Sequence, residues 1–341
     1  MTRLAVVVVT HESTRVLPPT LRALVPQLAE DDELVVVDCG SSDEPGALLR
    51  ELAPAARLIE LGENRGFAGG AAAGAEQTSA PLLFFLNPDA VPSPGCLDAL
   101  RAAAAAQPSW GAWQALVLLP GGSRVNTRGG VVHFLGLGWA GGYDEPAAAV
   151  PAGPVEVGFA SGAAMTLRRS AWEEVGGFEP TFFMYGEDLD LSLRLRLAGW
   201  GVGMVPAARV EHDYEFAEGD YKWFYLERNR WWAVIGTYPA TLLALLAPAL
   251  LLSELALLAV AGRGGWLRAK LRAQLAVLRT LPMALRRRRA IQARRRAGAG
   301  GFAAGLSASL DSPYLGPAAE VPGVRALQAG YWRAVRGAIG G

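Results

Sequence analysis

The stretch LAVVVVTHES, Leu4–Ser13, passes from six apolar residues directly into polar ones. A continuous, Val-rich run of this kind is typical of a strand buried on both faces of a parallel sheet. Three more apolar runs follow, separated by segments with helical spacing. Strands are predicted over 4–9, 34–37, 57–61 and 82–86, and helices over 17–28, 46–52 and about 68–76. This alternation predicts an α/β fold with a mostly parallel central sheet covered on both faces.

Polar side chains cluster where these predicted strands end. Thr10 and Glu12 follow the first strand, Asp38 follows the second, and Asn87 and Asp89 follow the fourth. The carboxyl ends of parallel strands share one edge of the sheet, and ligands bind there in open α/β folds. We therefore expect these five side chains to surround a ligand. For Asp38 the alternative is a local turn that opens the following serine-rich loop.

The segment FMYGEDLDLSLRLRLAGW, Phe183–Trp200, places Glu187, Asp188 and Asp190 at the start of an apolar helix. The positive end of a helix dipole favours ionised carboxylates. An ionised carboxylate held there can accept a proton from an alcohol that is brought to it. The alternative is that the three acids only cap the helix and pair with Arg194.

The chain has 341 residues and no net charge, but its charges are unevenly distributed. Between Leu255 and Leu310 there is no acidic residue, whereas arginines recur and are densest at 286–289 and 294–296. This asymmetry indicates an anionic surface as a partner. Cys39 and Cys96 have no paired spacing, so neither a disulfide framework nor a zinc cluster is indicated. The opening apolar run is too short for a signal peptide, so we expect cytoplasmic chemistry.

The residues Leu242–Val260 are almost wholly apolar and raise the question of a membrane span. A single span would put the arginine-rich run on the far side from the catalytic part, against the positive-inside rule. Pro248 and Glu254 also argue against it. A hairpin or in-plane element, followed by an amphipathic helix with leucines on one face, fits an anionic membrane surface on the inner face better. The alternative is that these helices pack on the rest of the chain or form a homodimer interface.

Seven segments, taken in order, resemble a family 2 inverting glycosyltransferase of the bacterial rhamnosyltransferase-like branch. The segments are VVVVTHES, VVVDCGSSDEP, NRGFAGG, FLNPDA, SGAAMTLRRSAWEEVGGF, FFMYGEDLDLSLRLRLAGW and ERNRWWAVIGTYP. The resemblance implies the GT-A fold, a nucleotide-binding α/β sheet. It also implies transfer of a sugar from a nucleotide diphosphate donor to a hydroxyl of a glycan or a lipid-linked saccharide.

The resemblance implies roles for individual residues. The donor nucleotide is expected at Thr10, Glu12, Asp38, Asn64, Gly66 and Asn87. A divalent ion, Mg²⁺ or Mn²⁺, is expected at Asp89 and His212, where the usual Asp-x-Asp has become Asn87-Pro88-Asp89. Asp188 is expected to be the general base, with Glu187 positioning the acceptor. The sugar or acceptor pocket is expected at Ser161, Gly162, Ala163 and Tyr185, and diphosphate contacts at Arg228 and Arg230.

These inferences divide the chain into a catalytic domain over 1–238, a hydrophobic and basic helical extension over 239–297, and a Gly/Ala-rich tail over 298–341. The favoured donor is dTDP-rhamnose, and a UDP-hexose is the alternative. A dinucleotide-dependent oxidoreductase would need a Gly-x-Gly turn after the first strand, which is missing here. A non-catalytic membrane-binding or nucleic-acid-binding protein is the remaining alternative. No nucleic-acid-binding signature accompanies the arginines, so we expect no nucleic acid partner.

Overall fold

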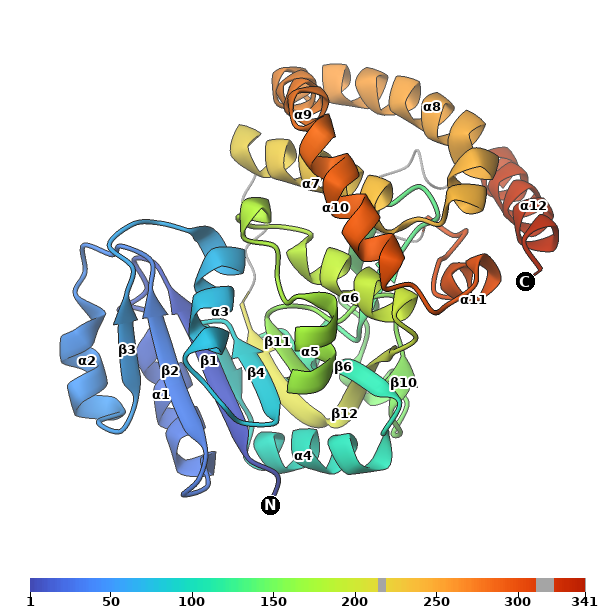
Figure 1. Ribbon diagram of the computed structural model, residues 1–341. Helices are drawn as coiled ribbons and strands as arrows, with labels where there is room; N and C mark the ends of the chain where they lie inside the picture. The colour runs from blue at the N-terminus through green and yellow to red at the C-terminus, as the bar shows by residue number, and fades with distance from the viewer. Residues whose placement is uncertain (214–218, 311–321, 341) are drawn as a thin grey trace.

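The computed structural model describes residues 1–213, 219–310 and 322–340. Its first part contains the four predicted strands in the parallel order β4-β1-β2-β3 (Figure 1). The strands are β1 Leu4–Thr10, β2 Glu33–Asp38, β3 Arg57–Glu60 and β4 Leu82–Leu86. The helices between them are α1 Leu17–Leu24, α2 Pro45–Leu52 and α3 Gly66–Glu76. The predicted α/β fold is confirmed, and β1 is buried along its whole length.

Side chains of β1 alternate between two separate cores. Val6 and Val8 face a core shared with α1, α2 and α4 (Cys96–Ala106). Ala5, Val7 and Val9 face the other core, shared with α3, α5 (Arg169–Val175) and α6 (Glu187–Leu197). Because successive strand side chains point to opposite faces, an all-apolar strand requires a helical layer on each side.

The second part of the sheet is mixed. Its strands are β5 Ala90–Pro92, β6 Trp110–Leu118, β7 Val125–Thr127, β10 Val155–Glu156, β11 Ala164–Arg168 and β12 Gly201–His212. The antiparallel strand β11 lies between β4 and β6, and β12 runs parallel to β6. A separate hairpin joins β8 Gly130–Val132 to β9 Gly138–Ala140. β12 also pairs with β5, with His212 opposite Ala90, so its end lies beside the turn that follows β4.

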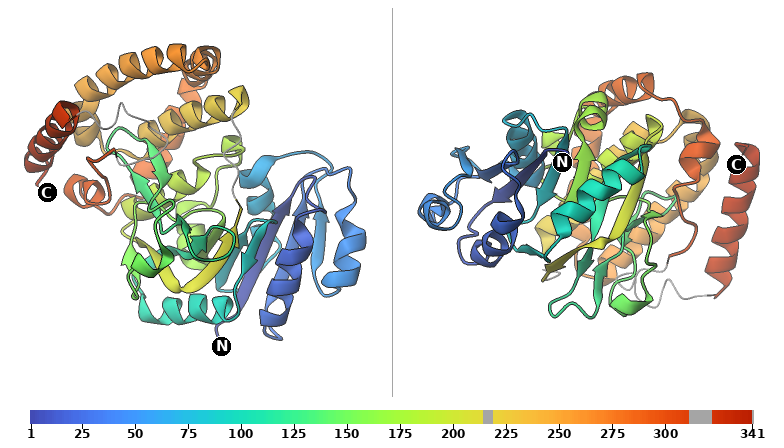
Figure 2. Two further views of the ribbon diagram at one scale, coloured as in Figure 1. Left: turned by 180° about the vertical axis from the view of Figure 1, so that it is seen from behind. Right: turned by 90° about the horizontal axis from the view of Figure 1, so that it is seen from below.

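The C-terminal helices are α7 Asp220–Thr237, α8 Ala240–Arg263, α9 Leu267–Arg279, α10 Leu281–Ala293, α11 Ala299–Ala303 and α12 Pro322–Ala338. They gather at the end of the molecule away from β3 and α2 (Figure 2). The leucine stripe expected in one amphipathic helix is divided between α9 and α10, because Pro282 starts a new helix after Thr280. α8, α10, α11 and α12 share a third core with α6 and α7. The segment 311–321 of the predicted tail lies outside the described residues.

One face of the C-terminal helices is apolar and exposed. α8 is the single helix in the described ranges with the length and apolar composition of a membrane span, and 11% of its most apolar stretch is buried. This finding alone is weak evidence for a span. Exposed leucines continue onto the neighbouring helices; they are Leu251, Leu252 and Leu255 on α8, Leu271, Leu275 and Leu278 on α9, and Leu281 and Leu285 on α10.

The acidic residue of α8, Glu254, points toward the rest of the protein. Glu254 pairs with Arg230 of α7 and, at 3.1 Å, with Lys270 of α9. Glu227 of α7 completes the cluster, 2.5 Å from Lys270 and 3.2 Å from Arg230. All four side chains are at most 12% exposed. The acidic residue within the apolar helix is thus explained by an internal ionic cluster that joins α7, α8 and α9.

Candidate active site

The acid-bearing helix α6 begins after a tight backbone turn. Phe183, Tyr185 and Gly186 have positive φ angles of 66°, 65° and 80°. For non-glycine residues this conformation is unfavourable and must be held by the surroundings. The hold comes from Asn229 of α7, which is 1% exposed. Its side-chain amide donates to the carbonyls of Phe182, Met184 and Tyr185 at 3.0, 2.9 and 2.6 Å.

Asp188 lies at the second position of α6 and is half-buried. Its carboxylate accepts hydrogen bonds from the backbone N–H of Gly162 at 3.1 Å and of Leu189 at 2.7 Å. Within the described ranges it forms no ion pair with Lys, Arg or His. Burial raises the pKa of Asp188, and the backbone donors, Gly162 first, offset part of that rise. A higher pKa makes a carboxylate a stronger proton acceptor.

The neighbouring acid, Glu187, is buried more deeply and is 7% exposed. One of its carboxyl oxygens, Oε2, has no hydrogen-bond partner among the described residues. Burial raises the pKa of Glu187 well above its ordinary value, and the charge of Asp188 raises it further. A buried carboxyl group without a cation favours its neutral form.

Asp190 behaves differently from both neighbours. It pairs with Arg194 at 2.8 Å and with Arg287 of α10. Burial alone would raise the pKa of Asp190, but the charges of Arg287 and Arg194 outweigh it and lower the pKa. The internal ion pair expected for the acidic segment therefore involves Asp190.

Asp89 and His212 approach one another at the ends of β4 and β12. His212 Nε2 lies 3.1 Å from Asp89 Oδ1 and 3.4 Å from the side-chain amide nitrogen of Asn87. Adjacent ligands of an octahedral ion with bonds of about 2.1 Å are separated by a similar distance, about 3.0 Å. In the described ranges, no group of three or more His, Cys, Asp or Glu converges as a metal site. Asp89 and His212 offer two ligands at this spacing, and a divalent ion held here would need further oxygen ligands.

A short backbone path joins this carboxylate–imidazole pair to Asp188. The N–H of Asn87 donates to the carbonyl of Ala163 at 3.0 Å, and Gly162, one residue earlier, donates to Asp188. A Cβ atom on Gly162 would lie 3.1 Å from the ring of Phe67, so the chain is closely packed there. Ser161 donates its N–H to Gln114 Oε1 of β6 at 2.8 Å. The predicted residues 161–163 thus lie between the Asp89–His212 pair and Asp188.

The loops after β1 and β2 brace one another. Glu12 accepts from the N–H of Ser42 at 2.7 Å and has a positive φ of 51°. Asp38 lies opposite Thr10 in the parallel register and accepts from the N–H and the hydroxyl of Ser41. These bonds to Ser41 form the local turn that was the alternative explanation of Asp38. In this structure its carboxylate is engaged in that turn.

Asn64 and Gly66 lie at the start of α3. Asn64 accepts from the N–H of Gly66 at 2.9 Å. Gly66 has a φ of +66°, and a Cβ atom there would lie 2.3 Å from the carbonyl oxygen of Phe183. Only glycine permits this close approach between the α3 loop and the turn before α6. Ala68 N–H donates to the same carbonyl at 3.1 Å.

The two arginines predicted to contact diphosphate have internal partners. Arg230 is 6% exposed, pairs with Glu227 and Glu254, and donates to the carbonyl of Leu135. Its guanidinium is thus engaged in the ionic cluster with Glu227 and Glu254. Arg228 donates to the carbonyls of Thr181 and Phe182 at 2.9 and 3.0 Å, and its guanidinium lies 4.2 Å from the ring of Trp232. Its described contacts hold the turn before α6.

Two residues near the site were not predicted. Asn229 lies in the sequence between Arg228 and Arg230, the two arginines predicted to contact diphosphate. Nothing else in the sequence marks it. Lys222 Nζ lies 5.4 Å from the ring centre of Tyr185, and burial lowers the pKa of Lys222 to about 8. A lysine near the start of an aromatic helix carries no motif that marks it.

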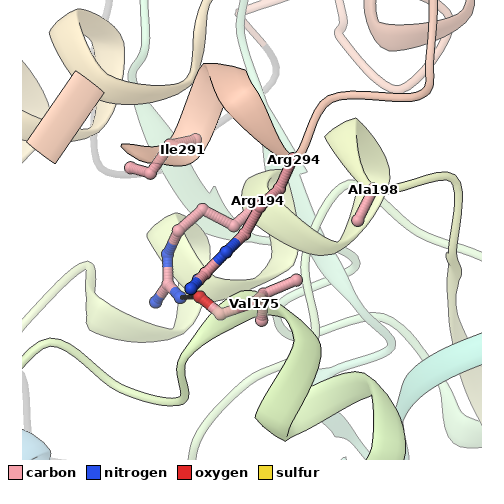
Figure 3. A pocket seen from close by; sticks show the side chains of 5 residues that line it. All are labelled: Val175, Arg194, Ala198, Ile291 and Arg294. Carbon is pink, nitrogen blue, oxygen red and sulfur yellow. Dashed lines mark hydrogen bonds between the residues drawn. The ribbon is translucent and has the colours of Figure 1, made fainter. Parts of the chain in front are cut away.

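A small pocket lies beside the C-terminal half of α6, and Asp188 is not among its lining residues. It is lined by Val175, Arg194, Ala198, Ile291 and Arg294, and Arg194 donates across it to the carbonyl of Val175 at 2.8 Å (Figure 3). No acceptor or donor role is expected there because Arg194 is already paired with Asp190.

The fold resembles solved nucleotide-sugar transferases. The crystal structure of GalNAc-T7 with UDP, GalNAc and Mn²⁺ matches with a TM-score of 0.57 at 16% identity, over 71% of this chain and 50% of that one. The mannosyltransferase PcManGT from Pyrobaculum calidifontis, in complex with GDP-Man and Mn²⁺, matches with a TM-score of 0.50 at 18% identity, over 97% and 85% of the two chains. At this identity the likeness concerns the fold, which is that of the GT-A glycosyltransferases.

Sequence comparison identifies the family. The profile of Glycosyl transferase family 2 matches residues 5–176, and that of Glycosyl transferase family 21 matches residues 142–300. The N-acetylglucosaminyl-diphospho-decaprenol L-rhamnosyltransferase of Mycobacterium tuberculosis is 32% identical over 240 residues, 63% of this chain and 78% of that protein. Rhamnosyltransferase WbbL of Escherichia coli is 40% identical over 75 residues, 22% of this chain and 27% of that one. The chain belongs to glycosyltransferase family 2, in its rhamnosyltransferase branch.

Proposed function

We propose that this enzyme transfers rhamnose from dTDP-rhamnose to a hydroxyl of a lipid-linked saccharide, with inversion at the anomeric carbon. The name of the Mycobacterium tuberculosis relative describes a rhamnosyl transfer to a sugar on a polyprenyl diphosphate. Asp188 carries the proposal, because it is an acid at the start of α6 with no ion-pair partner in the described ranges.

In the proposed reaction Asp188 takes the proton of the acceptor hydroxyl as the oxygen attacks the anomeric carbon. The bond between that carbon and the diphosphate breaks on the opposite face, so the configuration inverts. Glu187, with its raised pKa, would hold the acceptor by donating a hydrogen bond from a neutral carboxyl group. The pocket for the transferred sugar and the acceptor would be lined by Ser161, Gly162, Ala163 and Tyr185.

The donor would lie along the carboxyl ends of β1, β2 and β4. Thr10, Glu12, Asp38, Asn64, Gly66 and Asn87 remain its proposed contacts. Asp89 and His212 would hold the divalent ion, Mg²⁺ or Mn²⁺. When bound, such an ion would neutralise the charge of the departing diphosphate. Arg228 is proposed to act indirectly, by holding the turn that presents Asp188.

We also propose that residues 1–238 form the catalytic domain and that residues 239–297 place it on the inner face of the membrane. The exposed leucines of α8, α9 and α10 support an in-plane contact, and exposed arginines on the same helices suit anionic headgroups. Residues 298–341 would pack against this layer as a tail. Self-association through the same leucines is the competing use of this face.

The test is a thermal-shift panel of dTDP-rhamnose and UDP-hexoses, each with and without Mn²⁺ or Mg²⁺. A donor at ten times its dissociation constant stabilises the folded protein by about 1.4 kcal/mol. We expect that stabilisation for dTDP-rhamnose with the metal, and its loss in Asp89→Ala. Asp31→Ala, which removes an exposed aspartate away from the site, is the matched control. The absence of a shift with every nucleotide sugar in the panel would refute the proposed donor site. A shift with a UDP-hexose but not with dTDP-rhamnose would show that the donor is a UDP-hexose.

A further inference from the structure

A basic pocket on the outer surface of α10 has no role in the proposed transfer. It is lined by Ala240, Leu285, Arg288, Arg289, Gln292 and Arg295. No acidic side chain is among these lining residues, and the sequence has none between Leu255 and Leu310. Arg289 and Arg295 are exposed and have no ion-pair partner in the part of the chain that the structure describes. The pocket therefore concentrates positive charge that no neighbouring carboxylate balances.

Other arginines of the same run behave differently. Arg287 pairs with Asp190, and Arg296 pairs with Glu174. Arg287 therefore joins α10 to α6, and Arg296 joins the segment after α10 to α5. The arginine run is thus divided: Arg287 and Arg296 are paired with acids of the preceding part of the chain, whereas Arg289 and Arg295 of the pocket have no such partner in the described ranges.

The floor of the pocket is held rigidly. Arg288 Nη1 donates to the carbonyls of Ile235 and Tyr238 at 2.6 and 2.7 Å. Gln292 Nε2 donates to those of Gly236 and Thr237, each at 3.0 Å. These bonds satisfy the last carbonyls of α7, where the helix dipole is negative. Burial lowers the pKa of Arg288, and the charge of Arg295 lowers it further. A bound anion would relieve that repulsion.

The pocket continues into an apolar surface. Leu281, Leu285, Arg288 and Gln292 follow one another at spacings of four, three and four residues, so they share one face of α10, and Arg295 lies two residues beyond the end of the helix. Leu281 and Leu285 are 37% and 44% exposed. This face therefore presents leucines at its start, and the arginines of the pocket follow them along the chain. A free phosphate would use only the basic end, whereas a lipid matches both.

We infer that this pocket binds the phosphate group of a membrane lipid, with the lipid chain lying along the leucines. The inference deepens the proposed membrane contact and rests on it, because it names one site within the layer formed by α8, α9 and α10. It would fix the orientation of the enzyme on the membrane, since α10 is also the helix that contacts α6 through Arg287 and Asp190.

The experiment measures co-sedimentation of the full chain with phosphatidylcholine vesicles, with and without one fifth phosphatidylglycerol. The pocket variant is Arg289→Gln/Arg295→Gln. The matched control is Arg263→Gln/Arg268→Gln, which removes the same charge from exposed positions of α8 and α9. We expect the partition coefficient on phosphatidylglycerol vesicles to fall about tenfold further in the pocket variant than in the control. Equal losses in the two variants would show diffuse attraction and overturn the site.

Two further arms identify the source of the phosphate and separate this inference from the catalytic proposal. Calorimetric titration with inorganic pyrophosphate tests a soluble ligand. Tight binding that requires Arg289 and Arg295, with vesicle binding unchanged in the pocket variant, would replace the lipid by a free phosphate. Vesicle binding is measured without nucleotide sugar, and the thermal shift given by dTDP-rhamnose should be the same in the pocket variant. The lipid pocket and the donor site are thus tested by separate measurements, and a negative result for one does not affect the test of the other.

Discussion

Two pairs of carboxyl groups, one at the start of α6 and the other among α7, α8 and α9, have opposite surroundings. Glu187 and Asp188 at the start of α6 make no ion pair in the described ranges, and burial raises the pKa of each. Glu227 and Glu254 are enclosed by Arg230 and Lys270. Burial would raise the pKa of Glu254 as well, but the charges of Arg230 and Lys270 lower it.

The difference lies in the counter-ions. A buried carboxylate with cations around it is fixed in its ionised form and serves the structure. A buried carboxylate without them holds a proton more readily, which suits proton transfer. The comparison supports the assignment of Asp188, as opposed to the acids of the ionic cluster, to the chemistry.

The largest expected effect comes from Asp188→Asn, which removes the proposed proton acceptor. General base catalysis contributes about 10²- to 10⁴-fold, so we expect kcat for rhamnosyl transfer to fall by that factor. The melting temperature should not decrease, because a neutral amide is easier to bury than a carboxylate. Steady-state kinetics and thermal unfolding measure the two quantities. Transfer by the variant at close to the wild-type rate would contradict the assignment of Asp188 as the proton acceptor.

A smaller effect, on stability, is expected from Glu254→Gln. Removing one partner from a buried ionic cluster leaves Lys270 and Arg230 with excess charge and costs about 3 kcal/mol of unfolding free energy. Urea denaturation followed by circular dichroism measures it. The double variant Glu254→Gln/Lys270→Met should recover part of the loss, because the unpaired cation is removed as well. A single variant within about 0.5 kcal/mol of wild type would show that the cluster is not structural.

The smallest expected effect is on the pH dependence of the unfolding free energy, which should have opposite signs for Glu187 and Glu254. The folded pKa of Glu187 is raised, so its favourable contribution is present below its ordinary pKa near 4.5 and is lost as the pH rises through the folded value. That of Glu254 is lowered, so its contribution is present above about 4.5 and is lost as the pH falls through the folded value. Each unit of pKa difference corresponds to about 1.4 kcal/mol.

The measurement is the unfolding free energy between pH 3 and pH 8 of wild type, Glu187→Gln and Glu254→Gln. Relative to its Gln variant, the wild-type protein should lose stability with rising pH at position 187 and with falling pH at position 254. Slopes of the same sign at both positions would contradict the distinction drawn between the two pairs.

Much of the first half of the fold could be predicted from the sequence. The runs that form β1, β2, β3 and β4 are apolar and closely bounded by polar residues, and β4 begins and ends where it was expected, at Leu82 and Leu86. The strands between Trp110 and Glu156 were not placed. Several of them are two or three residues long and rich in glycine, so their periodicity is too short to read.

The sequence proposed the members of the site, but the bonds between them could not be predicted from it. Neighbouring acids at 188 and 190 look alike in the sequence, and only the fold brings Arg287 to the second of them, 97 residues away. The inward-facing arginines of α10 were likewise expected to meet a membrane. Asn229 was overlooked because a single buried amide has no spacing or charge pattern to reveal it.

The bond from Arg287 to Asp190 has a practical consequence for anyone who wishes to shorten the chain. A fragment ending near residue 239 would retain every proposed catalytic group, yet it would strip α6 of one cation and expose apolar surface that α8 and α10 now cover. Such a fragment is expected to aggregate when expressed alone. We therefore expect the sheet and its C-terminal helices to unfold together.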